Sequence, residues 1–378
     1  MLQILSEKRV YCISDEPDFK RLKFNRLNYL MNVLMLPLYG IGDTLMTTPA
    51  IEILKRNLDV KITNLCMFKT NFDLLRGNPF IDELIFFPFM DKDKFEALKF
   101  VLKMRKKFEY TINFYPSNRW QYNLLCWLFG ARKRIGHRYI KRDLRELNFL
   151  KNLTVRENEE LHNVQENVRL LEFFGIKTDK IPKMRLYLNR EEMNYGVKFV
   201  NQKSKKDIKI GIHTGTSSFK GHVRRRWAKE KFLALMNGFP EFDFFLFGTH
   251  EEELENRFIL DNAKYRNVFL VSDKTIREVA SIINQMNLFV SNDSGLMHLA
   301  AAVGIPVVAI FGPTNPKWVS PWGVINRVIR AELPCSPCFY YSPRPLECKN
   351  KVEFQCLRDI EVETVREAIL DLIKLSKT

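Results

Sequence analysis

The sequence contains no apolar run long enough to cross a membrane. Within its 378 residues, no segment approaches the ~18 to 20 uninterrupted apolar residues that a membrane-spanning helix requires. Residues 1–23 mix acidic and basic side chains and have no apolar centre of the kind that marks a signal peptide. We therefore expect a cytoplasmic protein.

The sequence also lacks a long tail of one charge sign and the glycine-aromatic signatures of RNA-binding modules. It is nevertheless strongly basic, with 60 Lys and Arg against 44 Asp and Glu and a formal net charge of +16. Such an excess favours an acidic partner, namely nucleic acid, an anionic membrane surface or a phosphorylated substrate. Because no motif supports nucleic acid, we do not expect it as a partner.

Cysteine is sparse except in one cluster near the C-terminus. Four of the seven cysteines follow the spacing C-x2-C-x9-C-x7-C, at Cys335, Cys338, Cys348 and Cys356. Four thiolates suffice for a structural zinc site, but this spacing is not the paired CxxC pattern typical of one. A redox-labile pair and plain packing of a loop are equally open readings of the cluster. No other metal site is expected.

The length favours two domains, and apolar segments alternate with helical patterns throughout. This alternation predicts parallel sheets with crossover helices, that is, an α/β doubly wound fold. We expect an N-terminal extension (1–31), a first Rossmann-like domain (32–185) and a second one (186–378), with a central cleft between them. We expect residues 44–58 to form one helix and the basic stretch 132–156 to be an irregular loop on the acceptor side.

The stretch Val290–Gly312 organises the second domain. Its pattern predicts a strand, a polar turn, a short helix and a second strand. Asn292, Asp293 and Ser294 are N-cap residue types, and the Gly295 that follows allows close approach to the backbone. A helix that begins at such a turn directs free N–H groups at one point and favours an anion, and His298 lies one turn further on. An ordinary capped βαβ unit with a buried histidine is the alternative.

A second turn, Gly40-Ile41-Gly42-Asp43, follows the first expected strand. It lacks the third glycine of a dinucleotide fingerprint and the GK[ST] of a P-loop. Asp43 is therefore either a helix N-cap or, at the carboxyl end of a strand, a general base.

Two further turns follow strands of the second half. The hydroxyl-rich loop 214–218 and the three arginines at 224–226 suit a diphosphate clamp or an exposed basic loop. The segment Gly248–Glu253 combines a glycine turn with acidic residues that satisfy a helix dipole. The functional alternative is that one edge of a bound nucleotide lies over Gly248.

Together these motifs resemble glycosyltransferase family 9, the lipopolysaccharide heptosyltransferases. The resemblance rests on Gly40–Asp43 with Thr47-Thr48-Pro49-Ala50, on Arg225-Arg226-Trp227, on Gly248–Glu253, on Ser291–Ala302 and on Phe311-Gly312-Pro313-Thr314. It covers roughly residues 32–375. Members commonly have lysine at the position of Arg225 and often proline at that of Ala228, and the extension before residue 32 has no counterpart.

The resemblance implies a GT-B fold and an inverting, metal-independent transfer from a nucleotide-diphosphate sugar, typically ADP-heptose, with no cofactor. It implies an anionic lipid-linked saccharide as acceptor and hence attraction to the inner-leaflet membrane surface. Asp43 is then the general base, and Gly40 and Gly42 lie on the acceptor side. The donor-binding residues are then Thr214, Ser217, Arg225, Arg226, Gly248, Thr249, Asp293, Ser294, Gly295 and His298.

Two alternative hypotheses remain beside the ADP-heptose transferase. The first keeps the fold and reaction but uses a different nucleotide-sugar donor. The second is a non-catalytic protein that binds nucleic acid or an anionic surface on a decayed transferase scaffold, and it rests only on the net charge. The joint presence of Asp43, Asp293 and His298 argues against the second.

Overall fold

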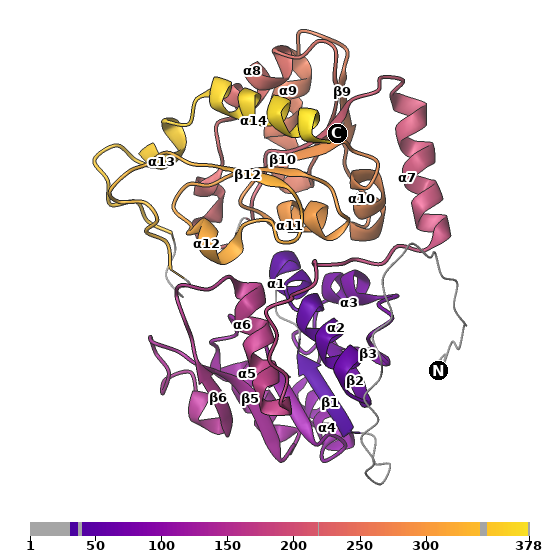
Figure 1. Cartoon of the computed structure of the whole chain (residues 1–378), viewed down its shortest axis with the longest axis vertical. Helices are drawn as coiled ribbons and strands as arrows, with labels where there is room; N and C mark the ends of the chain where they lie inside the picture. Colours follow the sequence, from indigo (N-terminus) through magenta and orange to yellow (C-terminus); the bar gives the residue numbers. More distant parts are fainter. Residues whose placement is uncertain (1–30, 37–39, 218, 341–345, 377–378) are drawn as a thin grey trace.

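The computed structural model describes residues 31–36, 40–217, 219–340 and 346–376. They form two lobes stacked along the long axis of the molecule, each built around a six-stranded sheet (Figure 1). The expected N-terminal extension lies almost wholly outside the described residues.

The sheet of the first lobe has the strand order β3-β2-β1-β4-β5-β6, and all its strand pairs are parallel. Its strands are β1 (Met31–Leu36), β2 (Val60–Cys66), β3 (Glu83–Phe86), β4 (Tyr110–Asn113), β5 (Lys133–Arg138) and β6 (Leu153–Arg156). Its helices are α1 (Ile41–Leu45), α2 (Thr48–Asn57), α3 (Lys69–Leu75), α4 (Lys94–Met104), α5 (Trp120–Leu128) and α6 (Asn163–Arg169), with 3-10 turns η1 (Asn148–Leu150) and η2 (Leu170–Phe174).

The sheet of the second lobe repeats this plan in the order β12-β11-β10-β7-β8-β9, again with parallel pairs only. Its strands are β7 (Lys209–His213), β8 (Asp243–Phe247), β9 (Val268–Val271), β10 (Leu288–Asn292), β11 (Val307–Ile310) and β12 (Asn326–Ile329). Its helices are α7 (Arg190–Lys203), α8 (Lys229–Asn237), α9 (Glu253–Asn262), α10 (Ile276–Ile283), α11 (Gly295–Ala302), α12 (Pro316–Val319), α13 (Gln355–Arg358) and α14 (Val362–Leu375), with η3 (Phe219–Arg225) and η4 (His250–Glu252).

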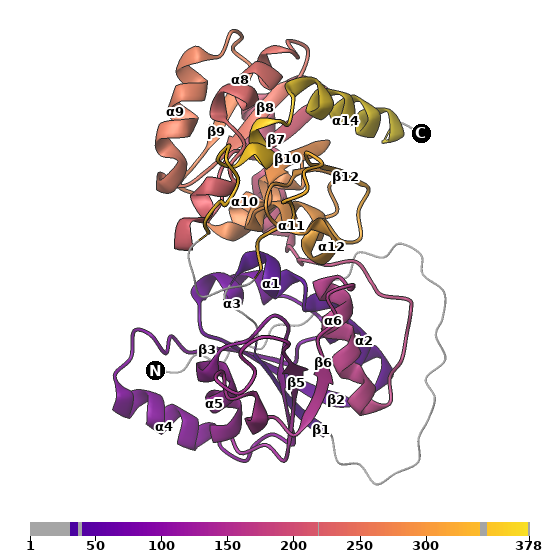
Figure 2. The same ribbon diagram turned by 90° about the vertical axis from the view of Figure 1, so that its left-hand side faces the viewer.

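Helices cover both faces of each sheet, which explains why the central strands are apolar on both sides. In the first lobe, α2 and η2 pack on one face, while α4 and α5 pack on the other (Figure 2). In the second lobe, α8 and α14 cover one face, and α10 and α11 cover the other. The prediction of two Rossmann-like, doubly wound domains is confirmed.

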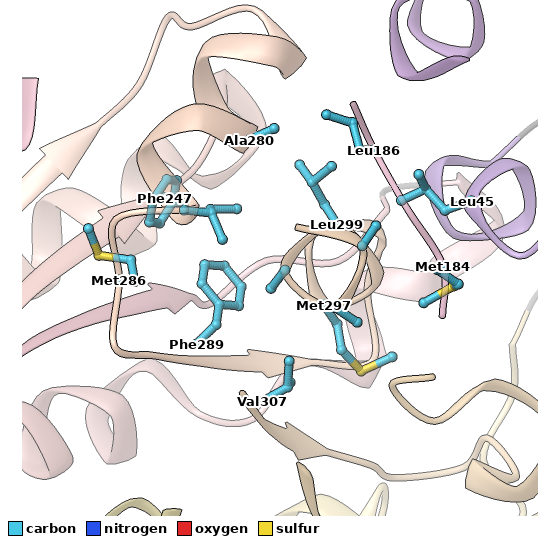
Figure 3. Packing of buried hydrophobic residues seen from close by; sticks show 14 of the residues in the cluster. Leu45, Met184, Leu186, Phe247, Ala280, Met286, Phe289, Met297, Leu299 and Val307 are labelled. Carbon is cyan, nitrogen blue, oxygen red and sulfur yellow. The ribbon is translucent and has the colours of Figure 1, made fainter. Parts of the chain in front are cut away.

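One apolar cluster joins the two domains. Leu45 of α1 and two residues of the extended connection, Met184 and Leu186, pack with Met297 and Leu299 of α11 (Figure 3). All five side chains are buried. The domain contact therefore contains an apolar core, which holds the carboxyl ends of the two sheets toward each other.

A buried arginine supports the same contact at one end. Arg277 of α10 donates to the carbonyl oxygens of Asp73 and Arg76 in the first domain, at 2.7 and 3.1 Å. It also donates to the carbonyl oxygen of Tyr187 at 2.6 Å and pairs with the carboxylate of Glu192. Its five donors are thus shared among the first domain, the connection and α7.

The stretch 132–156 is not the expected loop. It contains β5 and β6, which extend the first sheet at its β4 edge. Both strands carry charged residues on a partly exposed edge, so their sequence lacks the apolar run by which the central strands were recognised.

The expected helix 44–58 is divided into α1 and α2. Pro49 has no N–H to offer the carbonyl oxygen of Leu45, and the Thr48 hydroxyl donates to that oxygen instead, at 2.7 Å. Thr47 bonds the carbonyl oxygen of Thr44 in the same way. Among the helices of the described residues, none is both long and apolar enough to cross a membrane.

Candidate active site

The centre of the candidate site is a close contact between α1 of the first domain and α11 of the second. A Cβ atom added to Gly42 would lie 2.3 Å from Cδ2 of His298, and one added to Gly295 would lie 3.0 Å from Cβ of Ile41. Only glycine allows the two helices to approach so closely. The contact brings Asp43 next to the turn that precedes α11.

Burial raises the pKa of the Asp43 carboxyl to about 6. The negative charge of Asp293 raises it further, while the charge of Arg119 and a hydrogen bond from the Gly40 backbone lower it. A carboxyl group with this pKa is mostly ionised at pH 7 and yet basic enough to accept a proton efficiently. A general base needs both properties, so Asp43 stays a candidate for that role.

The N-terminus of α11 has no side-chain cap in the described structure. Ser294 occupies the N-cap position, but its hydroxyl contacts Nδ1 of His213 at 2.9 Å and Oγ of Ser291 at 3.0 Å. Asn292 instead donates to the carbonyl oxygen of Thr214 at 2.6 Å. The first amides of the helix are thus left for an anion, and the dipole favours a negative charge there.

Arg225 and Asp293 form a largely buried ion pair beside this helix end. Nη1 of Arg225 lies 2.6 Å from Oδ2 of Asp293 and 3.1 Å from Oγ1 of Thr314. Among the described residues, Nε of Arg225 has no hydrogen-bond partner. Asp293 therefore positions a guanidinium that retains a donor for a ligand.

Two buried histidines are neutral at physiological pH. Burial lowers the pKa of His298 to about 4 and that of His213 to about 3. Nδ1 of His298 has no partner among the described residues, so this ring can still hydrogen-bond a ligand. His213 was not predicted as a site residue. Its position could have identified it, because His213 ends the central strand β7 just before the hydroxyl-rich loop.

Arg226 points away from Arg225. It forms ion pairs with Glu252 at 3.0 Å and Glu255 at 2.7 Å, and it donates to the carbonyl oxygen of Thr216 at 3.0 Å. Its charge is balanced inside the second domain. Arg226 thus supports the loop 214–217, in which Ser217 is exposed.

The turn after β8 has its hydrogen-bonding groups occupied by the fold. Thr249 and Glu252 form a reciprocal capping box at the start of η4. A Cβ atom on Gly248 would lie 2.1 Å from Nδ2 of Asn256, whose Oδ1 accepts from the Thr214 hydroxyl at 3.2 Å. This packing shapes the surface beside the N-terminus of α11, and the residues that contribute to it are Thr214, Gly248 and Thr249.

The four clustered cysteines line one small cavity of about 10 Å³, together with Phe354 and other residues. All four are free thiols. Burial raises the pKa of Cys338 and raises that of Cys356 to about 11. Across the described ranges, no group of three or more Cys, His, Asp or Glu side chains is arranged to hold a metal ion.

Comparison with known sequences supports the resemblance. The sequence profile of glycosyltransferase family 9 (heptosyltransferase) matches residues 98–348, about two thirds of the chain. The match includes Arg225 and the Asp293–His298 segment, whereas Asp43 lies before it. Lipooligosaccharide heptosyltransferase 2 of Campylobacter jejuni is 33% identical over 175 residues, which is 44% of this chain and 51% of the relative. This chain thus spans about half the length of that relative.

A second relative matches over a longer range, and a solved structure shares the fold. Lipopolysaccharide heptosyltransferase 3 of Escherichia coli is 24% identical over 297 residues, covering 74% of this chain and 82% of the relative. The structure of E. coli ADP-heptose lps heptosyltransferase II superposes with a TM-score of 0.71 at 21% identity, covering 92% of this chain and 100% of that chain. The predicted GT-B architecture is confirmed.

Proposed function

The chain belongs to glycosyltransferase family 9, and from this premise we propose that it transfers heptose from ADP-heptose to a lipopolysaccharide core or a related anionic glycan. We further propose that the reaction inverts the anomeric centre and requires no metal ion. The observation that carries the proposal is the contact of α1 with α11, which sets a partly buried carboxyl of raised pKa beside an uncapped helix N-terminus.

Asp43 acts on the acceptor. It takes the proton from the acceptor hydroxyl as that oxygen attacks the anomeric carbon of the donor. The bond between this carbon and the diphosphate oxygen breaks, and the nucleoside diphosphate leaves with the electron pair. Because attack and departure occur on opposite faces in one displacement, the configuration is inverted. A single base on the acceptor domain is sufficient for this chemistry.

The second domain stabilises the leaving group. Negative charge grows on the diphosphate as the bond breaks, and the N-terminal amides of α11 favour negative charge at that place. Arg225, held by Asp293, adds a fixed positive charge nearby. These groups supply the charge stabilisation that a metal ion provides in other transferases, which is why we propose a metal-independent reaction.

The acceptor is proposed to be anionic and lipid-linked. The formal charge of +16 would attract both such a glycan and the inner-leaflet membrane surface. The protein would then work in the cytoplasm, at the periphery of the membrane.

Asp43→Asn tests the proposal directly. We expect kcat for transfer to fall by ~10²- to 10⁴-fold, because the amide cannot accept the proton, while ADP affinity stays within a few-fold. Asp59→Asn, which changes an exposed acid of the same domain, is the matched control and should transfer normally. Undiminished transfer by purified Asp43→Asn would refute the assignment of the base.

Calorimetric titration with ADP, UDP, GDP and their sugars tests the donor. We expect binding of ADP and ADP-heptose that EDTA does not weaken. A preference for another nucleotide would keep the reaction but replace the donor. Loss of binding or transfer in EDTA, restored by a metal ion, would contradict metal independence.

A further inference from the structure

Exposed apolar side chains concentrate on one part of the first domain. Of the eighteen large hydrophobic residues that are exposed in the described part of the chain, ten lie between Phe86 and Phe149. The most exposed of these ten are Met90, at 81%, and Phe95, at 75%. Such a concentration exceeds the scattered single residues that are normal on a protein surface.

The clearest part of this surface is the outer side of α4. At 100° per residue, Phe95, Leu98 and Leu102 fall within an arc of about 60°. All three are exposed, whereas Met104 on the opposite side and Val101 next to it are buried against the sheet. α4 is therefore apolar on its solvent side as well as on its core side.

Helix α5 repeats this arrangement. Trp120 and Trp127, seven residues apart, are both exposed, and Leu125, Cys126 and the following Phe129 are buried. α4 and α5 cover the same face of the sheet and share one apolar cluster beneath them (Figure 2). Their outer stripes therefore point away from the sheet in the same general direction. We call this surface the α4–α5 face.

The α4–α5 face is bordered by positive charge. Residues 92–109 contain seven basic and three acidic residues, a formal charge of +4. Two of the acids are engaged locally, because Asp93 caps α4 and Glu96 pairs with Lys92. Lys99 and Lys103 lie beside the apolar stripe, and no ion pair joins either of them to a described residue.

From this combination we propose that the α4–α5 face docks on a lipid bilayer that contains anionic phospholipid. Surfaces that insert into the headgroup region of a bilayer combine exposed aromatic and aliphatic side chains with lysines at their border. Lysines near such a surface are attracted to anionic lipid at a distance of about a Debye length. A second copy of the chain fits less well, because lysine is depleted from protein interfaces and like charges would face each other.

The position of the α4–α5 face links docking to the candidate site. α5 begins after the carboxyl end of β4, at the same sheet edge as Asp43. Arg119, the residue before α5, is close enough for its charge to act on Asp43. Docking thus brings the acceptor side of the site to the membrane surface, where a lipid-linked acceptor is located. Docking itself is independent of the reaction, but this role in acceptor delivery rests on the proposed function.

Co-sedimentation of the full-length protein with vesicles tests the proposal. We expect binding to vesicles of equal parts phosphatidylglycerol and phosphatidylcholine, and at least about tenfold weaker binding to phosphatidylcholine alone. The triple variant Phe95→Gln, Leu98→Gln, Leu102→Gln should also bind at least about tenfold more weakly. Its matched control is Met193→Gln, Val197→Gln, Leu254→Gln, which removes three exposed apolar side chains from α7 and α9 of the other domain and should bind normally.

Transfer to a soluble, delipidated acceptor separates this proposal from the proposed function. If the triple variant transfers normally but no longer binds vesicles, the proposal stands. Vesicle binding without any transfer would refute the proposed function and leave docking intact. Equal binding by the triple variant and the wild type would overturn docking. So would a wild-type dimer that only the triple variant dissociates, since a second copy would then be the occupant of the α4–α5 face.

Discussion

Gly42→Ala tests whether the approach of α1 to α11 is needed for transfer. Gly42 is helical and has an ordinary backbone conformation, so alanine in isolation would favour the helix by about 1 kcal/mol. The new Cβ atom would, however, lie 2.3 Å from Cδ2 of His298. Carbon atoms in good contact are about 3.5 Å or more apart, so the pair falls short by roughly 1.2 Å.

The shortfall can be relieved only by movement of one helix or of the His298 ring. His298 is 4% exposed and lies on a helix whose other side chains are packed. Overpacking of this kind costs about 1 to 3 kcal/mol of stability. A displacement of about 1 Å between Asp43 and the second domain costs roughly 10²-fold in rate, and we expect kcat to fall by that amount.

The assay is a double-mutant cycle with His298→Ala. Transfer rates, ADP affinity and the midpoint of thermal unfolding are measured for both single variants and for the double variant. Because His298→Ala removes the ring that the new methyl group meets, Gly42→Ala should cost little in that background. Equal costs of Gly42→Ala in both backgrounds, or an unchanged kcat in the wild-type background, would refute the reasoning.

Three further predictions concern the charges of the site. Because the pKa of Asp43 is raised from 3.8 to about 6, kcat/KM should increase as pH rises from 5 to 7, and the free energy of unfolding should fall as pH rises between these two pKa values. Asp293→Asn removes a neighbouring negative charge and should move the rise of kcat/KM, measured across this pH range, to lower pH; an unmoved profile would contradict this. Arg226→Ala leaves Glu252 buried without its partner and should lower the free energy of unfolding by about 3 kcal/mol, measured by denaturant titration, with ADP affinity changed less than about twofold. A large loss of ADP affinity without loss of stability would instead place Arg226 in the donor site.

The turns after β1 and β10 were predictable because each combines a buried apolar strand, glycine and a polar residue within a few positions. The sequence did not show which glycines are required by a contact between domains. Gly42 and Gly295 belong to separate local motifs, and only the fold brings each against a residue of the other domain.

The failures have physical causes as well. β6 is the edge strand and β5 lies next to it, and both carry charged residues, so the pattern of a buried strand is missing from residues 132–156. Arg225 and Arg226 are adjacent in sequence and indistinguishable by type, yet their partners, Asp293 and Glu252, lie in different segments. The division of roles between two neighbouring arginines is therefore a property of tertiary structure.

The buried Arg277 makes the two ends of the domain contact mechanically unequal. At its end, separation of the domains would strip a desolvated guanidinium of its two carbonyl partners in the first domain, those of Asp73 and Arg76, which is costly. At the opposite end, Lys317 contacts Glu160 through two exposed side chains, the indole N–H of Trp318 donates to the carbonyl oxygen of Glu159, and the His162 ring bonds the carbonyl oxygen of Ser320. An opening that keeps the Arg277 bonds would be a rotation about an axis near this residue, and it would have to break the bonds at the opposite end. Such a rotation would move Asp43 and Ser294 apart along an arc and open the site from the side of α12.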